Sequence, residues 1–247
     1  MIEVKGLTKY FGALAALQNA SFSVGAGEIV GFLGPNGAGK STAMRILTGF
    51  FPASRGEARV AGFEVHEQPL EVKRRIGYLP EHVPLYDEMT VKGFLDYVAR
   101  VKGLPRASRR REMSRVMEVC GLNDMGGRLL RQLSKGYRQR VGIAQALTGS
   151  PPVLILDEPT VGLDPGQIVE IRRMIRELGG THTVLLSTHI LPEVSMVCDR
   201  VIIISRGHIV AQDTMERLTA AGGKTLEQAF MEAVASDAKE AIGEDVT

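Results

Sequence analysis

The segment 34–42, Gly-Pro-Asn-Gly-Ala-Gly-Lys-Ser-Thr, constrains the fold of this chain more than any other stretch. It follows the mostly apolar residues 28–33, which are typical of a short buried strand. It leads into residues 40–47, which contain no Pro or Gly and are predicted to form a helix. The segment fits the pattern G-x-x-x-x-G-K-[ST], in which a glycine-rich loop joins a strand to a helix. We therefore predict an α/β fold with this loop at the edge of a sheet.

The residue types in the segment indicate a site for a nucleoside triphosphate. Glycines let backbone N–H groups turn inward around phosphate, and the following helix directs its positive N-terminal end at the same anion. Lys40 is expected to bridge the β- and γ-phosphates, and the Ser41 hydroxyl to ligate Mg²⁺. A glycine-rich turn that carries Lys-Ser by chance would not explain the complete pattern and its context. The predicted nucleotide contacts are Gly34, Pro35, Asn36, Gly37, Ala38, Gly39, Lys40, Ser41 and Thr42.

Composition limits the class of protein. The 247 residues suffice for one large α/β domain or for a core with an inserted lobe. The formal net charge of +2 argues against a strongly basic surface for nucleic acids. Cys120 and Cys198 form no C-x-x-C pattern, which indicates reduced, buried thiols. No apolar signal core follows Met1 and no apolar run approaches the span of a bilayer, so we expect a cytoplasmic protein that reaches a membrane only through a partner.

A second part of the site is expected where the apolar run 153–156 ends in Asp157 and Glu158. Such a run favours a central strand of a parallel sheet, and these sheets bind ligands at the carboxyl ends of their strands. Asp157 is placed to hold Mg²⁺ through water, and Glu158 to orient or deprotonate the attacking water. A helix cap ahead of Pro159 would explain this pair in isolation, but not beside a phosphate loop.

Three further side chains are candidates for contacts with the nucleotide. His189 follows the strand predicted over 183–187 and leaves the sheet at the same edge as the carboxylates, so we favour a γ-phosphate contact over a structural role. Tyr10 and Phe11 lie upstream of the loop. They either pack at a turn or stack on a nucleotide base, and their spacing leaves both options open.

Between the loop and the acidic strand, the chain is predicted to be mostly helical. Helical periodicity covers 91–101, 107–119 and 137–147, so a helical subdomain of about 81–149 interrupts a core formed by 1–80 and 150–220. Two short helices are expected to close a single domain near residue 234, ahead of a polar tail over 235–247. The arginines between 106 and 115 are interpreted as a solvated helix face. Contact with lipid headgroups or RNA is less favoured, because no aromatic residues are interleaved with them.

Several segments, in one order along the chain, resemble the motifs of ABC-type ATPases. Residues 133–140 read Leu-Ser-Lys-Gly-Tyr-Arg-Gln-Arg and resemble the signature sequence, usually Leu-Ser-Gly-Gly-Gln. They are followed by Leu-Asp-Glu-Pro-Thr at 156–160, Gly-Leu-Asp-Pro at 162–165 and Ser-Thr-His at 187–189. The resemblance covers residues 1–234. The sequences of these motifs, including Gly-Tyr-Leu-Pro-Glu at 77–81, are similar to those of the ATP-binding subunits of multidrug- and gliding-motility-type exporters.

This resemblance implies a P-loop NTPase core with an antiparallel β portion, and ATP with Mg²⁺ as its ligands. It implies a homodimer packed head to tail, in which Ser134 and Gly136 of one copy contact the nucleotide of the other in trans. Both residues precede a predicted helix, whose positive end suits a γ-phosphate. Phe11 becomes the preferred adenine-stacking residue. The resemblance also implies separate transmembrane permease subunits and a position on the inner face of the cell membrane.

Two departures from the family pattern bear on function. Glu81 stands where most of the family has Gln, in the loop that senses Mg²⁺ and faces the membrane partner. Glutamate keeps the acceptor oxygen but adds a charge, so Mg²⁺ affinity and coupling are expected to differ. Lys135 and Tyr137 replace Gly and Gln of the signature, whereas Ser134 and Gly136 remain. We therefore expect the phosphate contact to survive.

Three functions compete. The favoured one is the ATPase subunit of a membrane transporter, with export inferred from the resemblance. A soluble ABC ATPase acting on ribosomes or DNA usually carries two ATPase units or a long coiled-coil insertion, and neither is expected here. A phosphate-loop kinase is disfavoured by the signature and by His189. The transported substrate stays open, because the transport path is not in this chain.

Overall fold

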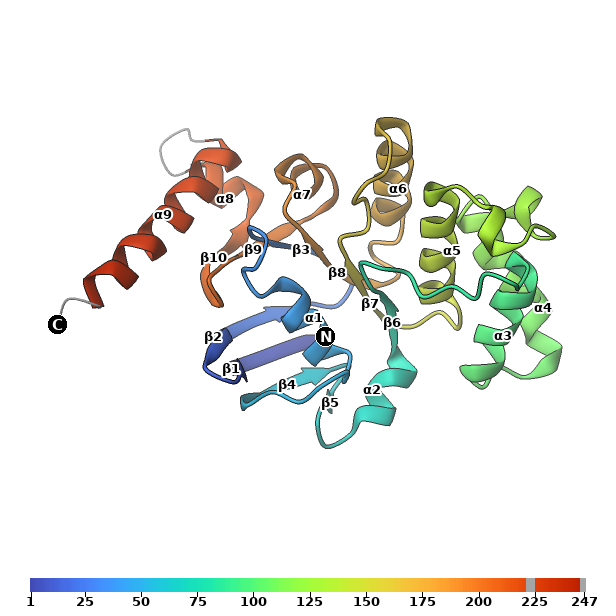
Figure 1. Ribbon diagram of the computed structural model, residues 1–247, viewed down its shortest axis with the longest axis horizontal. Helices are drawn as coiled ribbons and strands as arrows, with labels where there is room; N and C mark the ends of the chain where they lie inside the picture. The colour runs from blue at the N-terminus through green and yellow to red at the C-terminus, as the bar shows by residue number, and fades with distance from the viewer. Residues whose placement is uncertain (221–224, 245–247) are drawn as a thin grey trace.

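The computed structural model describes residues 1–220 and 225–244, and a six-stranded sheet forms the centre of this part of the chain (Figure 1). The strand order is β10-β9-β3-β8-β7-β6, and neighbours run parallel except in the β10–β9 pair. The strands are β3 (Ile29–Leu33), β6 (Ile76–Leu79), β7 (Val153–Asp157), β8 (Thr183–Thr188), β9 (Arg200–Ser205) and β10 (His208–Thr214). The predicted α/β class is confirmed.

Strand β7 is buried on both faces, as its continuous apolar run predicts. Val153 and Ile155 belong to one apolar core, and Leu154 and Leu156 belong to the other. Successive side chains of a strand point to opposite faces, so one strand serves both cores. The sheet therefore separates two cores, and Asp157 is the first polar residue where β7 leaves them.

A second sheet is entirely antiparallel, with the order β2-β1-β4-β5, and lies beside the first (Figure 1). Two of its strands are longer than the periodicity of the sequence predicts. The strand expected over 2–7 extends to Phe11, and the one expected over 20–24 begins at Leu14, because these ends pair with each other. Pairing satisfies the backbone N–H and C=O groups of these residues, although their side chains do not alternate between apolar and polar. The strands are β1 (Ile2–Phe11), β2 (Leu14–Val24), β4 (Arg55–Val60) and β5 (Phe63–Glu64).

The helical part lies between β6 and β7 in sequence and to one side of the sheet in space (Figure 1). The Thr90 hydroxyl caps the first helix by accepting the N–H of Gly93 at 3.1 Å, and Ser134 caps the last. Such caps satisfy N–H groups that a helix leaves unpaired. The three predicted helices are found within one or two residues of their expected limits. The elements are α3 (Val91–Val101), α4 (Arg106–Val119), α5 (Lys135–Leu147), η1 (Asn123–Met125) and η2 (Leu130–Gln132).

Four further helices connect strands of the sheets. Asp164 accepts the N–H of Gln167 at 3.0 Å, and Pro165 occupies the first turn, so both fix the start of α6. Cys120 and Cys198 are buried and free, as expected, and burial raises the pKa of Cys120 to about 12. The helices are α1 (Lys40–Leu47), α2 (Pro69–Arg75), α6 (Pro165–Glu177) and α7 (Leu191–Val197).

The C-terminal region corrects one expectation. The predicted hairpin turns at Arg206 and Gly207, whose φ angles of 44° and 87° suit a tight turn. The chain then forms α8 (Met215–Ala220) and α9 (Leu226–Glu244). The polar tail expected from residue 235 is instead helical to Glu244, because α9 contains no Pro and Asp237 pairs with Arg206 at 2.9 Å. Residues 245–247 lie outside the described residues. None of the described helices is both long and apolar enough to cross a membrane.

Candidate functional site

The phosphate loop, residues 34–42, contains two glycines at positions where a side chain would collide. A Cβ on Gly34 would lie 2.4 Å from the carbonyl oxygen of Ile204, and a Cβ on Gly39 would lie 2.4 Å from that of Ala16. Gly39 also has a φ of 105°, a conformation that side chains disfavour. Helix α1 begins with the next residue, so its unpaired N–H groups border the loop. The predicted order of strand, loop and helix is confirmed.

Three side chains predicted to be catalytic meet in one series of contacts. Lys40 Nζ lies 3.3 Å from Glu158 Oε1 and donates a hydrogen bond of 2.8 Å to the carbonyl oxygen of Gly34. On the other side of the same carboxylate, His189 Nδ1 lies 3.0 Å from Glu158 Oε2. Lys40 and Glu158 are buried, whereas the His189 side chain is 38% exposed. The fold thus joins residues from three distant segments of the chain.

The predicted Mg²⁺ ligands Ser41 and Asp157 contact each other. Ser41 Oγ donates a hydrogen bond of 3.2 Å to Asp157 Oδ1, and the Ser187 hydroxyl donates to the same oxygen. Burial raises the pKa of Asp157, the two hydroxyl donors oppose this shift, and the charges of Glu158 and Glu81 add to it. A cation bound beside Asp157 would favour the ionised form of this carboxylate.

A cleft of about 510 Å³ joins most of these residues. It contains Phe11 but not Tyr10, so of the two aromatic candidates only Phe11 borders the phosphate loop's cleft. The loop residues Gly34, Pro35 and Ala38 do not line it. The lining residues come from the antiparallel sheet, the phosphate loop, α1 and the segments that follow β6, β7 and β8: Phe11, Leu14, Ala16, Asn36, Gly37, Gly39, Lys40, Ser41, Thr42, Glu81, Glu158, Val161 and His189.

The signature residues Ser134 and Gly136 lie at the start of α5 and do not line this cleft. Ser134 accepts the N–H of Tyr137 at 3.5 Å. Gly136 is covered by Gln167, because a Cβ on Gly136 would lie 2.3 Å from the Gln167 Cδ. Within one chain, Ser134 and Gly136 therefore do not share a cleft with the phosphate loop.

A family model described as ABC transporter matches residues 17–161. The chain belongs to the ABC transporter family. It is 33% identical to the linearmycin resistance ATP-binding protein LnrL of Bacillus subtilis, over 92% of this chain and 74% of that protein. An ATP-binding subunit of an ABC transporter has a similar structure, with a TM-score of 0.86 and 31% identity over 94% of this chain and 99% of that one. The dimeric bacterial cassette MJ0796 gives a TM-score of 0.79 and 26% identity over 87% and 98%.

As an ABC ATPase, the protein binds ATP and hydrolyses it to ADP and phosphate; a post-hydrolysis dimer of MJ0796 is bound to these products. Some polar residues of this ATPase received no role from the sequence alone. Gln139 Nε2 donates a hydrogen bond of 2.8 Å to the carbonyl oxygen of Pro159, which links α5 to the segment after Glu158. Glu193 is also buried. The sequence signal for its burial is its position four residues before Val197, which places both side chains on one face of a helix.

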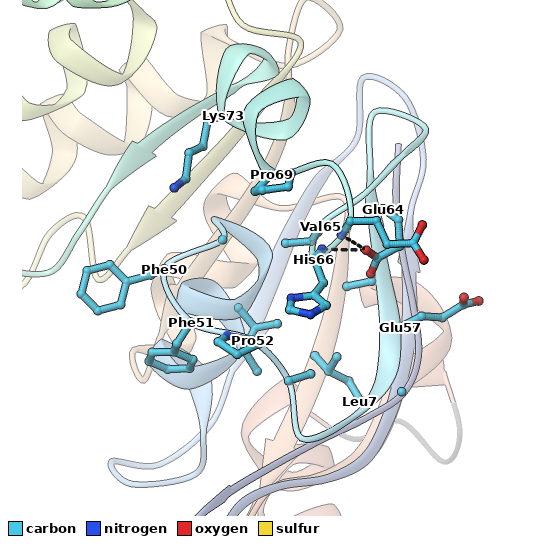
Figure 2. A pocket seen from close by; sticks show the side chains of 16 residues that line it. Leu7, Phe50, Phe51, Pro52, Glu57, Glu64, Val65, His66, Pro69 and Lys73 are labelled. Carbon is cyan, nitrogen blue, oxygen red and sulfur yellow. Dashed lines mark hydrogen bonds between the residues drawn. The ribbon is translucent and has the colours of Figure 1, made fainter.

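A second cavity of this ABC ATPase, of about 560 Å³, lies between the antiparallel sheet, the end of α1 and α2 (Figure 2). Phe51, Pro52 and His66 are among its lining residues. The Glu64 carboxylate accepts the backbone N–H groups of His66 at 2.7 Å and Glu67 at 2.5 Å, so it stabilises the local turn. None of the predicted site residues lines this cavity, and it is separate from the ATP cleft.

Proposed function

We propose that this ABC ATPase powers an exporter as a homodimer on separate permease subunits, at the inner face of the cell membrane and without nucleic acid. LnrL is named for linearmycin resistance and MJ0796 is a dimeric cassette, which supports export and dimerisation. The observation that carries the proposal is the single cleft shared by Phe11, the phosphate loop, Glu158 and His189.

The contacts among Lys40, Glu158 and His189 support their proposed roles. Lys40 neutralises Glu158 across 3.3 Å. A γ-phosphate would draw the Lys40 ammonium toward itself, which leaves the Glu158 carboxylate to orient a water molecule and accept its proton. Because His189 Nδ1 contacts Glu158, Nε2 is the ring nitrogen left for the γ-phosphate. Phe11 would stack on the adenine at the other end of the cleft.

Mg²⁺ fits beside Ser41 and Asp157, with Glu81 as a further oxygen donor. A hydroxyl and a carboxylate within 3.2 Å of each other match the oxygen ligands that Mg²⁺ takes, together with phosphate oxygens and water. The bound ion would neutralise charge on the β- and γ-phosphates. Within residues 1–220 and 225–244, no group of three or more His, Cys, Asp or Glu side chains is arranged as a metal site.

The proposed homodimer would complete each ATP site with the partner's signature. Ser134 and Gly136 lie at a helix N-terminus, which favours a negative group, and they share no cleft with their own phosphate loop. The γ-phosphate would be the group that both halves of the site contact.

A groove of about 600 Å³ is the proposed docking site for the permease. It is lined by residues of α1, β6, α5 and the segment after Glu81, including Tyr78, His82 and Pro84. Burial and the charge of Asp157 raise the pKa of Tyr78 to about 12, so this residue of the groove lies electrostatically close to the proposed Mg²⁺ ligand. A partner bound here would be placed to respond to nucleotide occupancy.

The test compares Glu158→Gln with Lys40→Ala in the purified protein. Glu158→Gln keeps the shape of the side chain but removes the base, so it should bind Mg-ATP and lose hydrolysis by about 10²-fold or more. Lys40→Ala removes the charge that holds the phosphates, so it should weaken nucleotide binding as well as turnover. Phosphate release gives turnover, and titration of a fluorescent ATP analogue gives binding. Near-normal turnover in Glu158→Gln would contradict the role of Glu158.

A further inference from the structure

Glu193 is a buried carboxylate that lies outside the ATP cleft but next to its machinery. It stands in the first turn of α7 and is 1% exposed. Each of its two oxygens accepts a different threonine hydroxyl. Thr160 Oγ1 donates to Oε1 at 2.6 Å, and Thr188 Oγ1 donates to Oε2 at 2.5 Å. The carboxylate therefore bridges two segments that are far apart in sequence.

The two threonines flank the groups that we propose for hydrolysis. Thr160 follows Glu158 by two residues, and Thr188 directly precedes His189. Both threonines are 1% exposed or less, so solvent does not compete for their hydroxyl groups. Thr188 Oγ1 also accepts the N–H of Ile190 at 3.0 Å, which orients its own proton toward Glu193.

The backbone at Glu158 needs support of this kind. Glu158 has a φ of 49°, in the left-handed region that residues other than glycine disfavour. Such conformations persist only where the surroundings hold them, and they are frequent at functional sites. The Glu158 N–H donates to the Ser187 hydroxyl at 3.0 Å, which fixes one side of the residue. The Thr160–Glu193 hydrogen bond fixes the segment on its other side.

Burying a carboxylate is unfavourable unless its oxygens are hydrogen-bonded. Burial raises the pKa of Glu193, and the two threonine hydroxyls and the charge of Arg172 oppose this shift. The charge of Glu158 acts on the same carboxylate. An apolar side chain at this position would avoid the cost of burial but would leave both hydroxyls without an acceptor.

We propose that Glu193 is a positioning residue, which holds the segment that carries Glu158 and the strand end that carries His189 at a fixed separation. The contact of 3.0 Å between His189 Nδ1 and Glu158 Oε2 then depends on a carboxylate that is hydrogen-bonded to Thr160 and Thr188 rather than to either of these side chains. This inference rests on the proposed roles of Glu158 and His189. A shift of a general base by a fraction of an ångström slows proton transfer without removing the phosphate contacts.

The experiment uses Thr160→Val and Thr188→Val, which keep the side-chain volume and delete one hydroxyl each. We expect kcat for ATP hydrolysis to fall about tenfold in each variant, with the KM for ATP and the affinity for a fluorescent ATP analogue changed less than about twofold. Thr160→Ser and Thr188→Ser restore the donor and should restore kcat. Because both hydroxyls act through one carboxylate, the double valine variant should lose less than the product of the two single losses.

Thr148→Val is the matched control. Thr148 is 1% exposed, and its hydroxyl donates to the carbonyl oxygen of Ala144 at 2.8 Å in α5, away from the ATP cleft. It should lower the melting temperature as the other valine variants do, and leave kcat unchanged. Equal kcat in all three valine variants, or parallel losses of kcat and ATP affinity, would overturn the positioning role. If Glu158→Gln loses turnover but the threonine variants keep their kcat, only the positioning role of Glu193 is refuted. If Glu158→Gln keeps normal turnover, the proposed role of Glu158 is refuted, and the inference that rests on it falls too.

Discussion

At the scale of single residues, Phe11 is the side chain that we propose to stack on the base. Its ring is 47% exposed at the cleft, makes an edge contact with Phe51 at 5.5 Å between centroids, and has Lys9 Nζ at 5.3 Å. If adenine stacks on this ring, Phe11→Ala should raise the apparent KM for ATP by an amount equivalent to roughly 1–2 kcal/mol, and Phe11→Tyr should change little. Tyr10→Ala is the control. Steady-state kinetics measures the KM of each variant. A raised KM for ATP in Tyr10→Ala and an unchanged one in Phe11→Ala would contradict the assignment.

At the scale of elements, the segment after Glu81 and the basic helix α4 offer different surfaces. His82 lines the proposed docking groove, and Tyr86 is 55% exposed nearby in sequence. We expect His82→Glu and Tyr86→Ala to weaken co-purification with the permease and to leave the ATPase activity of the isolated chain intact, because a charge or a lost ring disturbs an apolar contact.

Charge reversal on α4 is the control for that prediction. Arg109 lies 3.8 Å from Asp96, so its reversal would disturb the helical part itself. Arg110 and Arg111 are exposed and are better controls. Arg110→Glu with Arg111→Glu should leave the complex intact. If the complex were lost in the Arg110→Glu, Arg111→Glu variant but kept in His82→Glu and Tyr86→Ala, the proposed docking surface would be wrong.

At the scale of the whole molecule, ATP is expected to control association. The proposed dimer would offer the γ-phosphate charge-assisted contacts from Ser134 and Gly136 that a monomer lacks, and a ligand shifts an equilibrium only through such a difference in affinity. Glu158→Gln should therefore dimerise with Mg-ATP, stay monomeric with ADP, and fail to dimerise when Ser134→Arg is added. Wild-type protein should be mostly monomeric, because hydrolysis keeps emptying the dimer. Light scattering measures the mass, and a dimer indifferent to nucleotide and to Ser134 would refute the mechanism.

Short-range patterns in the sequence determined most of the elements and which functional groups the proposed site contains. The run 153–156 predicted a strand buried on both faces, and the spacing of Gly34, Gly39 and Lys40 predicted a loop between strand and helix. These predictions succeeded because each depends on neighbouring residues: side-chain alternation, a left-handed glycine, or a helix cap. The helices of the inserted part were predictable for the same reason.

Only the tertiary structure decided which distant residues meet. The ends of β1 and β2 carry no clear pattern and are strands because they pair with each other. α9 extends past residue 235, where Asp237 meets Arg206. Glu193 gained a role only when folding brought Thr160 and Thr188 to its two oxygens. The sequence alone determined the local conformations and the functional groups, because these follow from short spacings. Long-range pairing depends on how sheets and helices pack, which no local pattern encodes.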